Sequence, residues 1–490
     1  MRINMGAVNM QTTWLLLLVI SFSAGKTYGF SDLENFIRVI GSLNPNETVV
    51  NYLNGSVFWK QPKSILQKLF NYEGYNINRK IRQSDGTFLS LSREFVVYRQ
   101  PNTSEILQVW MNPISNNANE VFNVANDPVN AHIGSATPAM PVPPSLPKFL
   151  VYNTDIVLEY PNPLQPDNYA NYSAGPIYDS VELFGFFSNS TLVNASKTDS
   201  VPMTGTWMRK SQYLPWMVLG TTPGSLFYTT LAWKCSDGLQ CVADDIMQII
   251  KQNFPKYQYA PSTEEVPNET SWTAFKKIID QRRLAGLPDI IIPQVNASSD
   301  VRDMTYDVDQ RVLDILYKWP ITVRVNGTAW SEITGQQGIA LFDVGGYVGV
   351  DLEPLFDYSG YRLQLDGALI LYNRTTHAVM QNFHNPITGR VNKVKPLEVA
   401  IDLIFRRDSF FTVDIPSSEI VGLIGAQSTD TDNGWAVNML NILFPWQPGT
   451  GNLSSTFYGT WSSFASWPEF MVMGDTPGNI VQKLTVTNGM

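Results

Sequence analysis

The sequence predicts a mainly β protein with two tandem homologous antiparallel β modules, barrel-like or sandwich-like, and a few peripheral helices. Three observations lead to this fold class. Aromatic residues make up 12% of the chain and charged residues 16%, a balance that favours strands over helical bundles. Short runs of alternating apolar and polar residues lie between turn signals. A long stretch of sequence also occurs twice.

The elements follow from local patterns along the chain. Residues 31–40 (SDLENFIRVI) predict a helix, because Ser31 can cap it and apolar residues recur at helical spacing. Strict alternation predicts strands, most clearly at 88–98, 105–110, 181–187 and 361–372. Further helices are predicted at 244–254, 271–285 and 308–319. Strands follow one another through turns without a βαβ rhythm, which indicates antiparallel pairing.

The internal repeat is clearest in two pairs of segments. Residues 205–224 (GTWMRKSQYLPWMVLGTTPG) match 459–478 (GTWSSFASWPEFMVMGDTPG), and residues 54–75 match 326–347 without a gap. Asn-Gly, which opens the second pair, is typical of a type I′ hairpin turn, and Pro-Gly, which closes the first, is typical of a glycine turn. A chain of 490 residues is also too long for one ordinary core. We therefore expect a first module at 31–290, with a helical C-terminal extension, and a second, divergent module at 300–490.

The N-terminus has the features of a secretory signal peptide, which we place at residues 1–29. Arg2 is positively charged, the apolar segment 14–22 (WLLLLVISF) is too short to span a bilayer, and small residues follow it. The alternative is a buried N-terminal segment. No later segment is apolar over a spanning length. We expect a secreted, extracellular protein that has no membrane span and that can have extracellular partners.

Two further features agree with secretion. The chain contains Asn-x-Ser/Thr sequons, which are glycosylated on surface loops and turns. We predict a glycoprotein with candidate sites at Asn46, Asn54, Asn102, Asn171, Asn189, Asn194, Asn268, Asn296, Asn326, Asn373 and Asn452. Cys235 and Cys241 flank Asp237-Gly238, which is a tight-turn signal. We expect these cysteines to form a disulfide that pins a hairpin or a short loop.

Charge and motifs exclude several classes of function. The net charge is −9 and no long basic run occurs, so nucleic acid is not an expected partner. The chain has 3 histidines, and no His-x-His, His-Glu-x-x-His or Cys-x-x-Cys spacing predicts a metal site. A Gly-x-Ser-x-Gly nucleophile elbow and a glycine-rich phosphate loop are also missing from the sequence. We expect neither a metal nor a cofactor.

Four segments of the first module resemble the domain-of-unknown-function family numbered 1838. They are 69–79 (LFNYEGYNINR), 93–113 (REFVVYRQPNTSEILQVWMNP), 126–130 (NDPVN) and 214–220 (LPWMVLG). The likeness covers most of residues 31–290, and the second module looks like a divergent second copy. The resemblance implies no reaction, cofactor or catalytic set.

A comparison of the two modules points to polar positions that only the first retains. Gapless pairing makes Glu73 correspond to Gly345, and counting back from two matched tyrosines makes Glu94 correspond to Ala368. The candidate ligand-binding residues are Glu73, Arg79, Glu94, Asn126, Asp127, Asn130, His132 and Trp216. Structural roles remain open, since Asn-Asp-Pro is a turn signature and Glu–Arg pairs across strands are common. If LPWMVLG is an alternating strand, its aromatic and methionine side chains are also typical of an ordinary hydrophobic core.

These residues suggest a secreted glycoprotein whose first module binds a small apolar or amphipathic ligand. Whether the protein is an enzyme stays open. One alternative is a metal-independent cyclase, isomerase or hydrolase that uses the carboxylates of the first module. The other is an extracellular matrix or structural protein. Polar groups that converge in the first module alone would favour binding or catalysis over a structural role.

Overall fold

The structure is a computed structural model. It describes residues 15–16, 30–62, 64, 66–134, 139–140, 142, 148–195, 197–293, 308–317, 321–333, 338–356, 360–394, 396–406, 410–415, 420–431, 434–447, 449–473, 476 and 478–488. The predicted signal peptide therefore lies outside the described residues, except for the short strand β1 (Leu15–Leu16).

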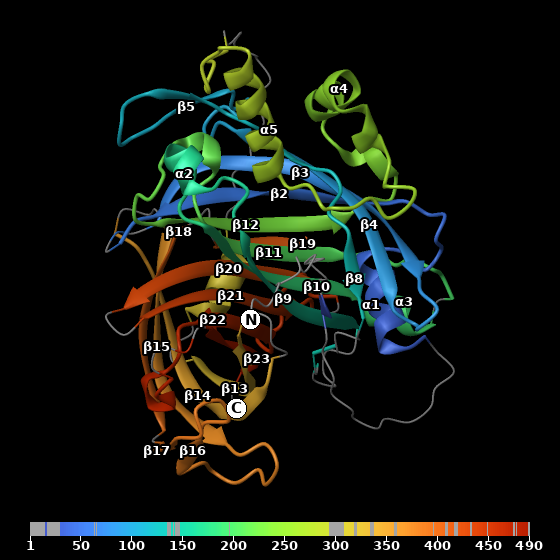
Figure 1. The fold of residues 1–490 in the computed structure, drawn as a ribbon. Coiled ribbons are helices and arrows are strands. Elements are labelled where there is room, and N and C mark those ends of the chain that lie inside the picture. Colours follow the sequence, from blue (N-terminus) through green and yellow to red (C-terminus); the bar gives the residue numbers. More distant parts are fainter. Residues whose placement is uncertain are drawn as a thin grey trace, which may run out of the picture.

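The predicted fold class is confirmed, because the chain forms two large sheets, each curled into a half-barrel (Figure 1). The first sheet has the spatial order β1-β8-β4-β3-β2-β12-β11-β10-β9, with β7 also paired to β4. All its pairings are antiparallel except β1 with β8. Its remaining strands are β2 (Val49–Lys60), β3 (Gln67–Arg82), β4 (Phe88–Arg99), β7 (Val124–Asn126), β8 (Ala131–Ile133), β9 (Phe149–Pro161), β10 (Ile177–Asn189), β11 (Thr204–Ser211) and β12 (Ser225–Lys234).

The second sheet has the order β18-β15-β14-β13-β23-β22-β21-β20-β19. Its strands are β13 (Ile321–Glu332), β14 (Ala340–Pro354), β15 (Gly360–Tyr372), β18 (Leu397–Arg406), β19 (Phe410–Ile415), β20 (Ile420–Thr431), β21 (Gly434–Pro445), β22 (Tyr458–Ala465) and β23 (Asn479–Asn488). When β2–β4 are set beside β13–β15, and β9–β12 beside β20–β23, the strand order is the same in both sheets.

Helices and small ribbons lie at the periphery. The α-helices are α1 (Asp32–Ile40), α2 (Pro166–Tyr169), α3 (Ser190–Ala195), α4 (Asp244–Asn253), α5 (Ser271–Leu284) and α6 (Gln310–Leu316). The 3-10 turns are η1 (Ala170–Tyr172), η2 (Pro215–Met217), η3 (Gly238–Cys241), η4 (Pro255–Gln258) and η6 (Glu469–Met471). Two ribbons pair β5 (Val109–Met111) with β6 (Ala118–Glu120), and β16 (Asn382–His384) with β17 (Val391–Lys393). The predicted strand at 105–110 is therefore wrong over most of its length.

Most of the predicted helices are confirmed, and they begin and end close to the predicted residues. Ser31 caps α1 in a capping box, in which its side chain accepts from the Glu34 N–H and the Glu34 carboxylate accepts from the Ser31 N–H. The helices predicted at 244–254 and 271–285 agree with α4 and α5 to within a residue. The helix predicted at 308–319 is shorter, since α6 covers only Gln310–Leu316.

The two sheets pack against each other through one face of each. Phe58, Leu183 and Met208 from the first sheet share a buried cluster with Met439 and Phe464 from the second. At the same interface Asn153 donates a hydrogen bond to Ser462 (3.1 Å). We call the face through which each sheet contacts the other its outer face. The opposite, concave side is the inner face.

The Asn-Gly pairs are not hairpin turns, which corrects the prediction from sequence. Asn54-Gly55 lies inside β2 and Asn326-Gly327 inside β13. A Cβ on Gly55 would lie 2.1 Å from the carbonyl oxygen of Thr229, and a Cβ on Gly327 would be equally close to that of Lys483. Glycine is therefore required because a neighbouring strand approaches the backbone closely.

The two sheets share an unusual turn before their last strands. In η2 and η6 the residue after the 3-10 turn is a valine with left-handed backbone, at φ +55° for Val218 and +46° for Val472. This backbone region is unfavourable for β-branched residues. LPWMVLG is thus a 3-10 turn, and the predicted alternating strand there is wrong.

A buried asparagine holds each of these turns. The Asn112 side-chain N–H donates to the carbonyl oxygen of Met217 (3.0 Å), and that of Asn385 donates to Met471 (2.8 Å). The amide oxygen of Asn112 also accepts from the backbone N–H groups of residues 114 and 115. These contacts give a physical reason for the Asn-Pro-Ile sequence at residues 112–114 and 385–387.

We expect Asn112→Ala to lower the free energy of unfolding by about 2–3 kcal/mol, because it removes three hydrogen bonds from a buried turn. Urea unfolding followed by circular dichroism measures this loss. Asn117→Ala, at an exposed position of the same loop, is the control and should stay within about 0.5 kcal/mol of the wild type. Equal effects of the two variants would contradict the role assigned to Asn112.

Candidate functional site

The structure divides the predicted site residues between the two faces of the first sheet. Glu73 pairs with Val97 across the β3–β4 ladder. Glu94 is three residues from Val97, and successive side chains of a strand alternate between faces. Glu73 therefore lies on the outer face and Glu94 on the inner face, so the two carboxylates do not form one site.

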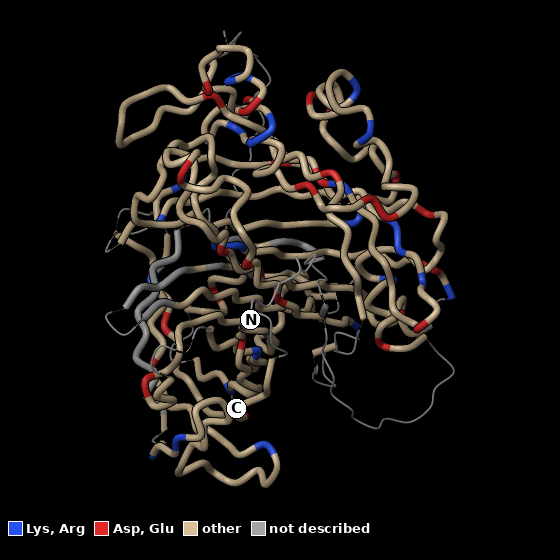
Figure 2. Tube along the Cα trace, in the orientation of Figure 1, with Lys and Arg blue, Asp and Glu red and all other residues tan. Residues whose placement is uncertain are grey.

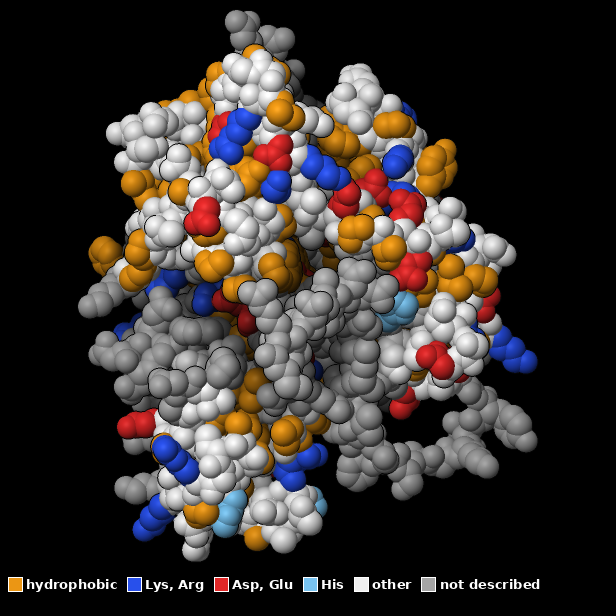
Figure 3. All heavy atoms as spheres, in the orientation of Figure 1, with side chains coloured by type: hydrophobic (Ala, Val, Ile, Leu, Met, Phe, Trp, Pro, Cys, Tyr) orange, Lys and Arg blue, Asp and Glu red, His pale blue; other side chains and the backbone are white. Residues whose placement is uncertain are grey.

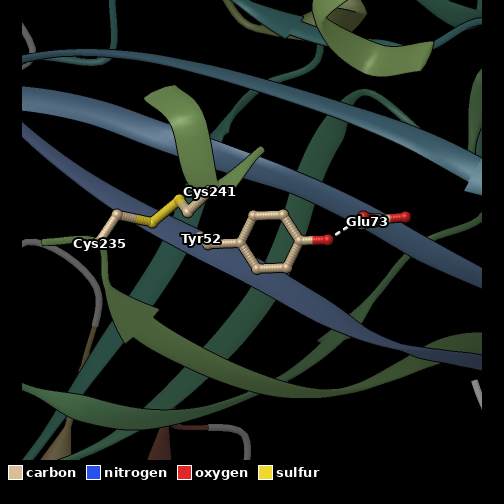
Figure 4. The surroundings of a disulfide bond; sticks show 4 residues. All are labelled: Tyr52, Glu73, Cys235 and Cys241. Carbon is tan, nitrogen blue, oxygen red and sulfur yellow. Dashed lines mark hydrogen bonds between the residues drawn. A yellow bond between two sulfur atoms is a disulfide. The ribbon is translucent and has the colours of Figure 1, made fainter. Parts of the chain in front are cut away.

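Glu73 belongs to a buried ion-pair network beneath α4. Its carboxylate pairs with Arg99 and accepts a hydrogen bond from the Tyr52 hydroxyl, which points toward it in Figure 4. Arg99 also makes two bonds to Asp245 at the start of α4, at 2.8 and 3.0 Å. The Arg99 and Glu73 side chains are only 1% and 2% exposed, respectively. This network fastens α4 to the sheet and leaves little room for a ligand.

The predicted disulfide between Cys235 and Cys241 is present near the same network (Figure 4). Its Cα atoms are 6.0 Å apart, a normal separation for a disulfide. The bond closes the short loop between β12 and α4, in which Gly238 takes a left-handed φ of +59°. The prediction of a pinned short loop is confirmed.

Arg79 and Asp127 hold the segment before α5 against the sheet. The Arg79 Nε–H donates to the carbonyl oxygen of Pro261 (2.9 Å). Asp127 pairs with Arg93, whose guanidinium also contacts Glu265 at 2.9 Å. These contacts are structural, and they place neither side chain near Glu94.

Asn130 and His132 contact the same segment before α5. The Asn130 side-chain N–H donates to the carbonyl oxygen of Glu265 (2.9 Å), and its backbone N–H donates to the Asn268 side chain (3.0 Å). His132 is exposed and lies 3.1 Å from Glu264. Figure 2 shows charged residues gathered around α5 and beside α4, at one end of the first sheet. Asn130 and His132 thus fasten the segment before α5 to the sheet, and they do not form a binding site.

Four polar residues come together on the inner face, and we call Glu94, Asn126, Glu182 and Arg209 the inner-face site. The Asn126 side-chain N–H donates to Glu94 Oε2 (2.8 Å), and its amide oxygen accepts from the backbone N–H of Ser271 at the start of α5 (2.7 Å). Glu182 and Arg209 face each other on β10 and β11, with 3.6 Å between Oε1 and Nε.

Arg209 is held by neutral groups as well as by Glu182. Its Nε–H donates to the Ser180 hydroxyl (3.1 Å), and Nη2 donates to the Tyr178 hydroxyl. The guanidinium also lies 5.8 Å from the ring centre of Tyr178 and 5.9 Å from that of Tyr228, within cation–π range. Among the residues that the structure describes, Nη1 has no hydrogen-bond partner.

The inner-face site has perturbed electrostatics. Burial has the largest effect on the pKa of Glu94 and raises it. The hydrogen bond from Asn126 and the charge of Arg209 lower this pKa, whereas the charge of Glu182 raises it, and the net shift is upward. Burial also raises the pKa of Glu182, against the opposing effects of Arg209 and the Trp207 indole N–H. Burial would lower the pKa of Arg209, but Tyr178 and Glu182 outweigh it and the net shift is upward. Arg209 therefore stays a cation, and the pKa of each carboxyl lies above that of an exposed glutamate.

The site is deep in the fold, yet two of its charged side chains stay partly accessible. The Glu182 and Arg209 side chains keep 14% and 19% of their surface accessible. Half-buried aromatic rings line the same face, with Phe184 and Trp207 at 6.5 Å between ring centres. Polar groups surrounded by aromatic side chains are the usual composition of a ligand site.

Trp216 lies at the end of the inner face, next to a cavity of about 220 Å³. Its ring packs against Phe70 and Tyr98, at 5.8 and 5.4 Å between ring centres. The cavity is lined by Tyr98, Phe122, Trp216, Phe254, Ser271 and Phe275, among others. Because Ser271 contacts Asn126, the cavity reaches the edge of the inner-face site. Of the predicted residues, the structure therefore joins Glu94, Asn126 and Trp216.

Helix α5 covers this end of the inner face, and ion pairs hold it there. Arg282 pairs with Glu120 of β6 at 2.7 Å, and Arg283 pairs at 2.7 Å with Asp289, whose carboxylate also accepts from the Tyr172 hydroxyl of η1 (3.0 Å). Figure 3 shows acidic and basic side chains intermingled on the surface around α5.

The second sheet has neutral residues at the equivalent positions. Gly74 and Gly346 correspond to each other, because each is approached closely by the next strand. A Cβ on Gly74 would lie 2.1 Å from the carbonyl oxygen of Phe95, and a Cβ on Gly346 would lie 2.1 Å from that of Ala368. Glu94 therefore corresponds to Gly367. The pairing with Ala368 made from sequence is off by one residue, which would place the equivalent side chain on the wrong face.

The partners of Glu94 are replaced as well. The matched Gly-Thr-Trp segments of β11 and β22 make Arg209 correspond to Ser463. Strand register then makes Glu182 correspond to Asn438, which accepts a hydrogen bond from Trp461 (3.0 Å). The inner face of the second sheet encloses a cavity of about 70 Å³ lined mostly by Leu, Ile and Val side chains, with Asn438 and Trp461 also in its wall.

Sequence reasoning missed Glu182 and Arg209. The signal that could have found them is their phase with aromatic residues, within the strand predicted at 181–187 and within residues 206–211, for which no strand was predicted. Glu182 alternates with Phe184 and Phe186 in VELFGFF, and Arg209 with Trp207 in TWMRKS. A charged residue in phase with large aromatic residues is expected to share their buried face, where it needs a partner.

No group of three or more His, Cys, Asp or Glu side chains in the described part of the chain could hold a metal ion. None of the described helices is long and apolar enough to cross a membrane.

Residues 46–279 match the model of the family described as "Protein of unknown function (DUF1838)". No curated protein matches the chain. One similar solved structure is a protein of unknown function from the DUF3598 family of Nostoc punctiforme, at 8% identity and a TM-score of 0.24, covering 94% of this chain and 100% of that one. Another is the putative AttH from Nitrosomonas europaea, at 7% identity and a TM-score of 0.11, covering 96% and 99%. The translocator domain of the autotransporter NalP from Neisseria meningitidis has 7% identity and a TM-score of 0.10, covering 91% and 90%.

Proposed function

We propose that the protein binds a small amphipathic ligand on the inner face of the first sheet, with the polar end of the ligand at Arg209. The observation that carries the proposal is the inner-face site itself. Two carboxyls and a guanidinium converge among aromatic side chains, and Glu182 and Arg209 keep 14% and 19% of their surface accessible.

A comparison of the two sheets supports a role in binding over a role in stability. Buried charges are costly, and well-packed apolar residues commonly stabilise a core as well as ion pairs do. The second sheet has the same strand order with Gly367, Asn438 and Ser463 in place of the three charges. Since the architecture does not need these charges, a ligand is the better reason for their presence.

We also propose that the second module is a divergent copy of the first, with bounds of 31–290 and 300–490. The common strand order supports this, and so do the paired close approaches at Gly55 and Gly327. The matching left-handed valines, Val218 and Val472, add independent support.

Secretion and glycosylation remain part of the proposal. The Cys235–Cys241 disulfide supports an oxidising compartment. Exposed sequon asparagines are Asn46, Asn102, Asn171, Asn194, Asn326, Asn373 and Asn452. Asn54 is half-buried within β2, and the Asn268 side chain is engaged with Asn130, so these two positions are poor acceptors. Asn189 is half-buried at the end of β10, and Asn296 lies outside the described residues.

Native mass spectrometry of the deglycosylated protein from its natural source is the direct test. We expect one additional mass per chain, which denaturation releases, together with any absorption that the ligand contributes. A clean protein mass would contradict a retained ligand and would favour the matrix or structural alternative.

A fluorescent probe tests the role of Arg209. We expect 1-anilinonaphthalene-8-sulfonate, an aromatic anion, to bind the recombinant protein, and Arg209→Met to weaken its affinity by about 10-fold or more, because a charged hydrogen-bond donor is lost. Arg311→Met, at a side chain that is 45% exposed, is the matched control and should leave the affinity unchanged. Unaltered binding by the Arg209 variant, with the fold intact by circular dichroism, would refute the proposed site.

A further inference from the structure

We infer that the inner-face site catalyses a proton shift in an unsaturated carbonyl compound, with Glu182 as the base, Glu94 as the acid and Arg209 as the group that binds the carbonyl oxygen. This inference rests on the proposed function and adds to it a substrate class and a role for each charged residue.

The arrangement of strands places the two carboxyls apart. Glu94 lies on β4 and Glu182 on β10, and four strands, β3, β2, β12 and β11, separate them in the sheet. Both side chains lie on the inner face of a sheet that is curled into a half-barrel, and they are near enough for the charge on Glu182 to act on Glu94. A ligand between them would have one carboxyl on each side, which suits removal of a proton at one carbon and its delivery at another.

Local contacts assign the base and the acid. Glu182 is the carboxyl that faces Arg209 directly, with 3.6 Å between Oε1 and Nε, so its ionised form is favoured over that of Glu94. Glu94 uses Oε2 to accept from Asn126, which leaves Oε1 to carry the proton. The charge on Glu182 also raises the pKa of Glu94, in the same direction as burial.

Arg209 fits the role of a fixed electrostatic group. Its Nε and Nη2 are occupied by Ser180 and Tyr178, and its cationic form is maintained by the surrounding tyrosines and Glu182. Its Nη1, which has no partner among the described residues, is available to donate to a carbonyl oxygen. A donor held in position in a water-poor site stabilises an oxyanion as charge develops on it.

The step balances without another reactant. Glu182 takes a proton from the carbon between the carbonyl and the carbon–carbon double bond. The electrons of that C–H bond form a dienolate, whose oxygen is stabilised by Arg209. Glu94 then gives its proton to the far carbon of the double bond, which restores the carbonyl and leaves the double bond conjugated with it. After product release, Glu182 loses a proton to water and Glu94 gains one.

The aromatic side chains of the inner face favour a substrate that is apolar apart from its carbonyl group. Phe184, Trp207, Tyr72 and Tyr228 stand around the charged residues, with Tyr72 5.6 Å and Trp207 5.8 Å from Tyr228 between ring centres. Such a surface accommodates cyclic or isoprenoid enones, in which the hydrocarbon part supplies most of the binding energy.

The test uses β-isophorone, a small β,γ-unsaturated ketone that becomes the conjugated α-isophorone through this proton shift. We expect the wild-type protein to accelerate formation of the conjugated absorbance over buffer, and to incorporate deuterium at the γ carbon in D2O. Glu182→Gln and Glu94→Gln should each lower kcat by about 100-fold or more, because each removes one proton-transfer group.

Further measurements separate catalysis from structure. Glu159→Gln, at an exposed position of β9, is the matched control and should keep full activity. The Glu182 and Glu94 variants should retain binding of 1-anilinonaphthalene-8-sulfonate, which shows that the fold and the cavity persist. A wild-type protein that binds this probe but does not accelerate the shift overturns the inference and leaves the proposed binding function standing. Activity retained by Glu182→Gln overturns it as well. Failure to bind the probe refutes the proposed function itself.

Discussion

Replacement of Glu73 by alanine is expected to lower the free energy of unfolding by about 3–5 kcal/mol. Glu73 and Arg99 are almost wholly buried, at 2% and 1% exposure. The substitution leaves part of the Arg99 charge without its partner and removes the acceptor of the Tyr52 hydroxyl. It also weakens the attachment of α4, because Arg99 bridges Glu73 and Asp245. Urea unfolding of the intact chain, followed by circular dichroism and tryptophan fluorescence, measures the loss.

Two variants separate the ion pair from packing. Glu73→Gln keeps the size of the side chain and an acceptor oxygen, so we expect a smaller loss, of about 1–2 kcal/mol. Tyr52→Phe removes only one hydrogen bond and should cost about 1 kcal/mol. A loss below about 1 kcal/mol for Glu73→Ala would show that Asp245 alone satisfies Arg99, and would contradict the role given to Glu73.

Replacement of Lys80 by methionine is expected to raise the free energy of unfolding at pH 7 by about 2 kcal/mol. Lys80 lies on β3 against Gly41, directly after α1, and its ammonium group donates to Ser90 at 2.6 Å. Burial lowers its pKa to about 7. Burial also lowers the pKa of Lys234, with Lys80 and Arg38 acting in the same direction and Glu47 opposing. Methionine keeps the apolar length of the side chain and removes the charge.

The same residue predicts a pH dependence with a definite sign. An unfolded lysine keeps its proton up to about pH 10.5, whereas folded Lys80 loses it near pH 7. Between these values the unfolded chain binds more protons, so the free energy of unfolding should rise with pH by at most about 1.4 kcal/mol per unit. Below pH 7 both states are protonated and this contribution is constant.

Urea unfolding between pH 6 and pH 10 measures both effects of the lysine. We expect Lys80→Met to reduce the rise with pH, while the exposed Lys256→Met, the control, keeps the wild-type profile. A wild-type profile for Lys80→Met would mean that Lys80 is charged in the folded protein throughout this range.

The candidate site could be predicted only in part from the sequence. Glu94 and Asn126 were found because the second module lacks them, and the structure joins them at 2.8 Å. Glu73 was found by the same reasoning, yet it lies on the opposite face. Both faces of β3 and β4 are buried, one beneath α4 and the other against the inner aromatic cluster. Alternation of polarity therefore cannot tell which face of these strands encloses the site.

The Asn-Gly pairs show a similar limit. Asn54-Gly55 has the composition of a hairpin turn, but it lies within a strand because the Thr229 backbone crosses beside Gly55. The need for glycine came from a residue 174 positions later in the chain, and local propensity contains no information about such a contact.

By itself the sequence determined the mainly β class, the positions of most helices and the Cys235–Cys241 pair. These features depend on periodicity, capping residues and short spacings, which act within about a dozen residues of the chain. Only the tertiary structure decided that Glu182 and Arg209 join Glu94 and Asn126, and that Glu73 does not. The curl of the sheet brings β4, β10 and β11 around one space, and that curl arises from the twist and packing of the whole sheet rather than from any single strand.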